Sequence, residues 1–282
     1  MNEMTIYQTR LSNFIGKFLI VFLIIQPIFD IKYYYNSIST LIRVIIIFAL
    51  FLYYFFTSKN KKKYWLLIYP AAISIYFIFH HINALHFTSL VPGNFNYSIF
   101  KEVLYFVKML SPFLLIYSLY RANLNDDTII QIMKLLVLTI SSIIIISNLL
   151  GFSYGSYSDM TIKANFFEWF NPYSTYVYQD LASKGLFEFA NQISAILIMF
   201  LPFILYHSLN NHKFSNWFTL ILNIFALMLL CTRVSVLGVL VVFVYTIFAF
   251  IFISSRKKEH IILKKYIPVR NYIISLWIAI TY

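Results

Sequence analysis

The sequence predicts an all-α fold, a polytopic bundle of transmembrane helices, and three observations lead to this prediction. Only 11% of the 282 residues are charged, whereas 61% are hydrophobic, and a soluble domain usually carries about 25% charged residues. The apolar residues also fall in runs, since residues 41–56 and 129–150 contain one charge each and residues 234–253 contain none. Runs of about 20 apolar residues are typical of helices that cross a bilayer. The composition therefore excludes a water-soluble enzyme, a nucleic-acid-binding domain and a disordered chain.

We predict eight full spans and a ninth that begins near the end of the sequence, all in a single transmembrane domain, residues 1–282. The spans lie at about 14–30, 38–56, 64–81, 103–120, 129–149, 190–207, 217–232 and 234–254, and the partial span lies at 271–282. A loop of about 40 residues, 150–189, separates the fifth span from the sixth.

Lysine and arginine are unevenly distributed among the loops. With the N-terminus in the cytoplasm, 13 of the 22 basic residues fall in cytoplasmic loops and four in external loops. Because basic residues collect in cytoplasmic loops, we predict a cytoplasmic N-terminus and an external loop 150–189. The same rule explains the formal net charge of +12 without a nucleic-acid partner. Cys231 is the single cysteine, so there is no disulfide framework.

Three basic residues lie within or beside predicted spans at a similar depth near the outer leaflet. Arg43 is a few residues into the second span, Lys108 is about two turns into the fourth, and Arg233 lies at the junction of the seventh and eighth. Charge at such positions is costly, and a residue of this kind usually faces an interior site. A cationic ring at this depth suits a lipid-linked phosphate or pyrophosphate, which binds charge-assisted donors.

A structural interpretation of these cations stands beside the functional one. Basic side chains near the ends of spans commonly extend to the membrane interface, and we assign Lys17 and Lys134 to this class. Arg233 differs, because it lies in a turn with polar neighbours. His80 and His81 are adjacent and cannot point in the same direction, so the sequence predicts no metal site.

Two polar stretches interrupt the apolar background. The first runs from Ser183 to Gln192 with the sequence SKGLFEFANQ and leads directly into the sixth span, which contains Pro202. The second, TRVSVLG, runs from Thr232 to Gly238.

Together these stretches resemble the bacterial O-antigen ligase and polysaccharide polymerase superfamily. Its members carry a Gly-x-Phe/Leu-x-x-x-Asn element that enters a helix, a proline-containing span, and then a Thr-x-Ser/Thr-Arg element followed by glycine. The matching residues are Gly185, Phe187, Asn191, Pro202, Thr232, Arg233 and Gly238, whereas Leu230 stands where the second element begins with threonine.

The resemblance implies a multi-pass glycosyltransferase of the bacterial cytoplasmic membrane, acting at its outer face in cell-surface polysaccharide synthesis. It would transfer or polymerise a glycan from a polyprenyl-pyrophosphate carrier without a metal or another cofactor. Its partners would be this lipid-linked oligosaccharide and membrane lipid, and no nucleic acid. The glycan, the acceptor and the oligomeric state stay open.

Residue roles follow from the resemblance together with the cations. We expect Arg43, Lys108 and Arg233 to bind the pyrophosphate, Arg233 also serving in catalysis, with Asn191 and Thr232 as polar contacts. Glu188 is the expected base for the acceptor hydroxyl. Gly185, Pro202 and Gly238 complete the motif.

Relatives of this kind carry ten to twelve spans and a large external loop after the Thr-Arg element. We therefore expect the chain to be truncated at its C-terminus, with part of the active site missing. Two alternatives to a transferase remain open. One is a flippase or transporter of lipid-linked oligosaccharides, and the other is an inactive, truncated remnant.

Overall fold

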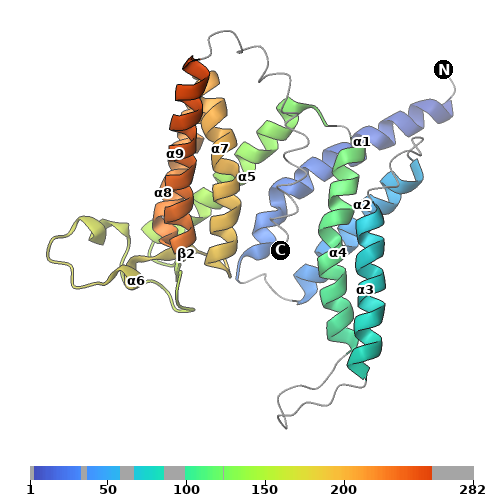
Figure 1. Cartoon of the computed structure of the whole chain (residues 1–282), viewed down its shortest axis with the longest axis horizontal. Helices are drawn as coiled ribbons and strands as arrows, with labels where there is room; N and C mark the ends of the chain where they lie inside the picture. The colour runs from blue at the N-terminus through green and yellow to red at the C-terminus, as the bar shows by residue number, and fades with distance from the viewer. Residues whose placement is uncertain (1–2, 33–36, 58–66, 86–98, 123, 256–282) are drawn as a thin grey trace. The chain divides into compact units, whose positions relative to one another are not determined.

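The computed structural model describes residues 3–32, 37–57, 67–85, 99–122 and 124–255, and Figure 1 shows their elements in chain order. The chain divides into two compact units. One unit comprises Met1–Ser39 and Asn125–Tyr272, and the other comprises Thr40–Leu124 and Ile273–Tyr282. The prediction of a single transmembrane domain stays a prediction.

The first unit contains helix α1, the short 3-10 helix η1, and every element from α5 onwards. Pro27 lies in the first turn of η1, where its fixed φ and missing N–H end the regular α-helix before it. The bounds are α1 (Glu3–Ile25), η1 (Gln26–Asp30), α5 (Asp126–Leu149), β1 (Tyr154–Gly155), η3 (Phe166–Phe170), α6 (Tyr178–Leu181), β2 (Ser183–Gly185), α7 (Ala190–Asn210), α8 (Phe214–Leu230) and α9 (Arg233–Ser255).

The core of this unit lies where α8 packs against α5 and α7, and where α7 packs against α9. On α5 the buried positions recur every four residues, at Ile132, Leu136, Ile140 and Ile144, which places them on one helix face. In Figure 1 the helices α5, α7, α8 and α9 lie beside one another, and β2 and α6 lie at one end of this group.

The loop between α5 and α7 contains the only sheet in the described residues. β1 and β2 pair antiparallel, with Tyr154 opposite Gly185 and Gly155 opposite Ser183. This short sheet is an addition to the predicted all-α fold. It fixes the path of the chain just before α7 begins.

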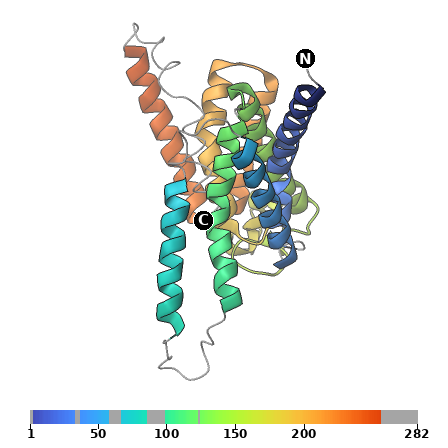
Figure 2. The same ribbon diagram turned by 90° about the vertical axis from the view of Figure 1, so that its right-hand side faces the viewer.

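The second unit contains most of α2 (Ser37–Thr57), with α3 (Ile68–Leu85) and α4 (Ile99–Ala122). Aromatic rings join α3 to α4, since the Phe77 and Phe106 centroids are 4.3 Å apart and those of Tyr69 and Phe113 are 4.2 Å apart. Another ring contact joins α2 to α4 (5.2 Å between Phe51 and the buried Tyr117). Figure 2 shows that α3 and α4 run in opposite directions along the chain.

Each of the eight predicted full spans overlaps a helix of the described residues, with bounds that differ by several residues in places, as for α3 (Ile68–Leu85) and the predicted span 64–81. Within the part of the chain that the structure describes, five helical stretches are long and apolar enough to cross a membrane: Ser12–Asp30, Ile38–Thr57, Glu102–Ala122, Asp126–Leu149 and Ala190–Leu209. Large apolar side chains are also exposed along helices such as α9, where Leu237 and Val241 are more than 60% exposed, as expected of a surface that faces lipid. The structure thus supports a multi-pass membrane protein. The count of eight crossings and the cytoplasmic N-terminus stay predictions, and the partial span from residue 271 lies outside the described residues.

Helices α7 and α9 run parallel and approach closely at one glycine. A Cβ atom placed on Gly238 of α9 would lie 2.5 Å from Cδ1 and 2.8 Å from Cγ1 and Cγ2 of Ile198 on α7. Small residues allow helix backbones to approach in membranes. Gly238 is therefore required by helix packing, whatever else its motif does.

We predict that Gly238→Ala will lower the stability of the protein in detergent by about 1–3 kcal/mol, the usual effect of overpacking. Adding Ile198→Ala to this variant should recover part of the loss, because it removes the atoms that the new methyl group meets. Thermal unfolding of the purified protein measures both effects.

Gly16→Ala in α1 is the matched control, since a Cβ atom there meets nothing within 4 Å. A Gly238→Ala variant that is as stable as Gly16→Ala would show that α7 and α9 pack less closely at this glycine.

Candidate functional site

An open pocket of about 360 Å³ lies in the first unit, beside the start of α7. Its wall is formed by residues 156–159 of the long loop, by Lys184 of β2, and by residues 188–191, which lead into α7. Polar and charged side chains from separate parts of the chain therefore meet in one concave site, as is typical of sites that bind small molecules.

The wall containing Lys184 is held by residues 183–188, which we call the strap. Gly185 has a φ of +67°, and a Cβ atom there would lie 2.9 Å from the Cα atom of Ile144 on α5. Only glycine combines this φ with such a close approach at no steric cost. The Ser153 and Ser183 hydroxyl groups hydrogen-bond each other in the interior, and Ser153 also donates to the carbonyl of Gly185 (3.2 Å).

The outer edge of the strap pairs with the chain that follows η1. The amide of Lys32 donates to the carbonyl of Leu186 (2.8 Å), and the amide of Glu188 donates to the carbonyl of Asp30 (3.2 Å). Ile31 and Phe187 thus form an antiparallel bridge. The strap is fixed on both sides, by β1 and by residues 30–32.

The turn from α8 to α9 lies next to the pocket. Cys231 adopts a left-handed conformation (φ +50°) after the last residue of α8, and its carbonyl accepts a hydrogen bond of 2.8 Å from the hydroxyl of Tyr157, which lines the pocket. Thr232 then caps α9, because its hydroxyl oxygen accepts from the amide of Ser235 (3.0 Å). Arg233 follows as the first residue of α9, and its side chain is exposed.

A buried hydrogen bond ties this turn to α7. The hydroxyl groups of Thr232 and Ser194 are 2.8 Å apart, and the Ser194 hydroxyl also donates to the carbonyl of Ala190 (2.9 Å). Because Gly238 contacts Ile198 further along the same two helices, the N-termini of α7 and α9 lie at the same end of the unit. The partial positive charge of each helix N-terminus, about half an elementary charge, favours anions there.

Charged side chains meet at the loop edge of the pocket. The Oδ1 atom of Asp159 is 3.2 Å from Nζ of Lys32 and 3.3 Å from Nζ of Lys184. The hydrogen bond from Lys32, followed by that from Lys184, holds the pKa of the Asp159 carboxyl below its ordinary value. The side chain of Lys184 is only 6% exposed, whereas that of Asp159 is 76% exposed.

Two of the predicted site residues line the pocket. Glu188 is half-buried and Asn191 is exposed, and Arg233 lies two residues beyond the Cys231 carbonyl that Tyr157 holds. Thr232 is 2% exposed and its hydroxyl is engaged in the cap, and its use as a substrate contact stays a prediction. These hydrogen bonds fix the backbone directly before Arg233.

The remaining motif residues do not line the pocket. Gly185 and Gly238 occupy close backbone contacts, and Pro202 lies inside α7. Arg43 on α2 and Lys108 on α4 belong to the second unit, where the Lys108 ammonium lies 5.8 Å from the ring centre of Tyr105. A ring that joins these two cations to Arg233 stays a prediction.

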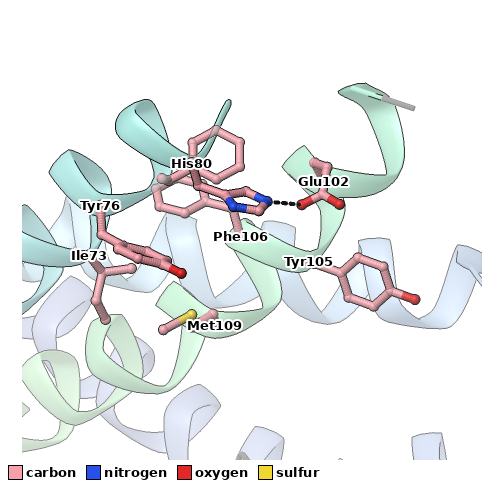
Figure 3. A pocket seen from close by; sticks show the side chains of 8 residues that line it. Ile73, Tyr76, His80, Glu102, Tyr105, Phe106 and Met109 are labelled. Atoms are coloured by element: carbon pink, nitrogen blue, oxygen red, sulfur yellow. Dashed lines mark ion pairs between the residues drawn. The ribbon is translucent and has the colours of Figure 1, made fainter. Parts of the chain in front are cut away.

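The second unit has a smaller pocket of about 170 Å³ between α3 and α4, shown in Figure 3. Nε2 of His80 is 3.6 Å from Oε2 of Glu102 at its edge, and Tyr76, Tyr105 and Phe106 are among its aromatic walls. Among the residues that the structure describes, no group of three or more His, Cys, Asp or Glu side chains could hold a metal ion. His80 and Glu102 form a pair, which is too few ligands for a metal centre.

Three charged residues at the larger pocket, beside the start of α7, were not predicted from the sequence. Lys184 lies inside the first polar stretch, directly before Gly185, so its place in the motif was a usable signal. Lys32 and Asp159 lie in no local sequence pattern that would indicate a site.

Lys134, predicted to extend to the interface, instead donates from α5 to the side chain of the buried Asn216 on α8.

A family model described as O-antigen ligase like membrane protein matches residues 12–281. No curated protein and no solved structure matches the chain.

The charges around Asp159 predict a dependence of stability on pH. Because the folded state lowers the pKa of Asp159, its ionised form contributes stability above the pKa of the unfolded chain, about 3.9. That contribution disappears as the pH falls through the folded pKa. The difference in thermal unfolding between the wild type and Asp159→Asn should therefore be constant at pH 5–7 and shrink as the pH falls below about 4, towards the lowered pKa of the folded state.

The matched control is Asp180→Asn, which removes the carboxylate that lies 3.1 Å from Lys163 in the same loop. A difference between the wild type and Asp159→Asn that persists unchanged at low pH would contradict the assignment to Asp159 ionisation.

Proposed function

Since the chain belongs to the O-antigen ligase-like membrane protein family, we propose that it is a membrane glycosyltransferase. It takes a glycan from a polyprenyl-pyrophosphate carrier and transfers it to an acceptor sugar at the outer face of the cytoplasmic membrane. The observation that carries this proposal is the exposed Arg233 at the N-terminus of α9, beside a pocket that holds a carboxylate, an amide and a buried lysine.

The leaving group defines what the site must do. When the bond between the anomeric carbon and the pyrophosphate oxygen breaks, the electron pair goes to the pyrophosphate, and negative charge builds up on its oxygens. Fixed cations and helix N-termini stabilise such charge most effectively when they are positioned before the reaction. Arg233 fits this role, because its planar guanidinium can donate two parallel hydrogen bonds to phosphate oxygens.

The hydrogen bonds around Thr232 support this role for Arg233. The cap on α9 and the bond to Ser194 fix the backbone from which Arg233 projects. The hydroxyl of Tyr157 donates to the carbonyl of Cys231, two residues before Arg233. A long side chain on a fixed backbone loses less conformational entropy when it binds.

The acceptor hydroxyl must lose a proton as its oxygen attacks the anomeric carbon. Glu188 is the proposed base for this step. Its position supports the proposal, because it lines the pocket from the segment that enters α7, and a carboxylate within hydrogen-bond distance of a hydroxyl can act as a general base. Asn191 lies less than one helical turn further along and supplies amide donors for a phosphate or sugar oxygen. Arg43 and Lys108 are proposed as further cations for the carrier.

We predict that Arg233→Ala will reduce the rate of glycan transfer by about 10²–10³-fold, the usual effect of removing one donor to a developing oxyanion. Arg233→Lys should retain part of the activity, because it keeps the charge and loses the bidentate geometry. The measurement is chain lengthening of a polyprenyl-pyrophosphate-linked oligosaccharide, isolated from the source organism, in proteoliposomes containing the protein.

Lys213→Ala is the control, since it removes an exposed cation just before α8, outside the pocket. Wild-type lengthening by Arg233→Ala would contradict the role of Arg233. Movement of the lipid-linked glycan across the bilayer without any lengthening by the wild type would favour the flippase alternative.

We also predict that Glu188→Gln will lower the turnover number by about 10²–10⁴-fold, the contribution of a positioned general base, with little change in KM for the donor. The same assay measures both parameters. Glu168→Gln is the matched control, because Glu168 is a carboxylate of η3 in the same loop and lies outside the pocket. Equal losses in both variants would show that the effect comes from the loop as a whole and that Glu188 is not the general base.

A further inference from the structure

Two lysines converge on a single oxygen atom at the edge of the pocket. Nζ of Lys32 is 3.2 Å and Nζ of Lys184 is 3.3 Å from the same Oδ1 atom of Asp159. Lys32 also donates to the main-chain carbonyl of Asp159 (3.4 Å). The position of Oδ1 is therefore one at which an anionic oxygen is bound by two ammonium groups.

Both lysines are held by the surrounding structure. Lys184 belongs to β2, and its side chain is 6% exposed. The amide of Lys32 is bonded to Leu186 of the strap, and its ammonium lies 4.7 Å from the ring centre of Tyr154. These contacts keep both ammonium groups at the edge of the pocket.

Asp159 is held much less tightly than the lysines it contacts. Its side chain is 76% exposed, and it lies in a turn whose main chain is closed by the bond from the Gly155 amide to the Met160 carbonyl (3.0 Å). A rotation about its side-chain bonds would remove the carboxylate from the lysines and leave that turn intact. The carboxylate can therefore leave the lysines without unfolding the loop.

The charges explain why a carboxylate occupies this position. Two ammonium groups close together repel each other, and a partly buried pair is stable only with an opposite charge beside it. Phosphate oxygens can provide that charge as well as a carboxylate can. Asp159, Lys184, Asn191 and the Ser156–Ser158 segment all line the same pocket, so an anion that replaced the carboxylate would have room and further donors.

We propose that Lys32 and Lys184 form a binding subsite for a phosphate oxygen, and that Asp159 is an internal placeholder that the ligand displaces. The site is defined by the contacts of these three residues alone. Naming its ligand as the pyrophosphate of a lipid carrier rests on the proposed function. The placeholder also assists release, because its return to the lysines competes with the pyrophosphate product that remains after transfer.

The test is equilibrium binding to the full chain in nanodiscs, measured separately with inorganic pyrophosphate and with a polyprenyl pyrophosphate. Asp159→Asn removes the competing charge at nearly constant shape, so its affinity for both probes should rise about tenfold. Lys32→Ala and Lys184→Ala should lower the affinity by about tenfold or more. These factors correspond to about 1.4 kcal/mol.

Asp180→Asn is the matched control, because it removes another loop carboxylate that pairs with a lysine, and its affinity should equal that of the wild type. Lys32→Ala keeps the test decisive if Lys184→Ala fails to fold, since the side chain of Lys32 is 28% exposed. Binding of the lipid probe alone would identify the carrier as the ligand, and equal effects on both probes would show that the phosphate groups suffice.

Two results would overturn the proposal. Unchanged or weaker binding by Asp159→Asn would show that Asp159 does not compete with the ligand, and unchanged binding by both lysine variants would show that the lysines do not form the subsite. Neither result depends on transfer. A wild type that binds pyrophosphate as expected but lengthens no glycan would instead contradict the proposed function and leave the subsite in place.

Discussion

The hydrogen bond between Ser194 and Thr232 is the interaction on which the rest of the site depends. It joins the second turn of α7 to the cap of α9 in the buried interior of an apolar helix bundle. In such surroundings an unpaired hydroxyl or amide is costly, so polar groups must find partners within the protein. The chain meets this requirement with one threonine, whose hydroxyl serves both the helix cap and the contact with α7. These two contacts of Thr232 fix the position of the Arg233 backbone, which follows directly in the chain.

A second constraint acts through the strap. Gly185 brings the backbone against α5, which is compatible with its positive φ and its lack of a side chain. The strap then pairs with β1 on one side and with residues 30–32 on the other. Lys184 is buried because it lies on this paired segment, and Asp159 compensates its charge. A packing requirement thus produces an electrostatic feature at the pocket edge.

The two polar stretches have different tasks within one site. The first provides the pocket wall and the side chains of Glu188 and Asn191, whereas the second provides a fixed turn that ends in an exposed arginine. Family membership and this division of tasks both fit a reaction in which a bulky pyrophosphate leaves while a hydroxyl attacks. The surrounding apolar helices supply the rigid support that such a site needs.

The sequence by itself determined the membrane class, the mainly helical fold and the family. These properties follow from local patterns, because apolar runs of span length and a motif within a few residues can be read without knowing the fold. It also led to the proposal of Glu188, Asn191 and Arg233 as site residues, since polar residues stand out in an apolar background. Only the tertiary structure decided that Thr232 is a buried cap and that Lys32 meets Asp159, 127 residues further along. Such contacts depend on which backbone segments the strap and the helix packing bring together, and no short spacing in the sequence records that.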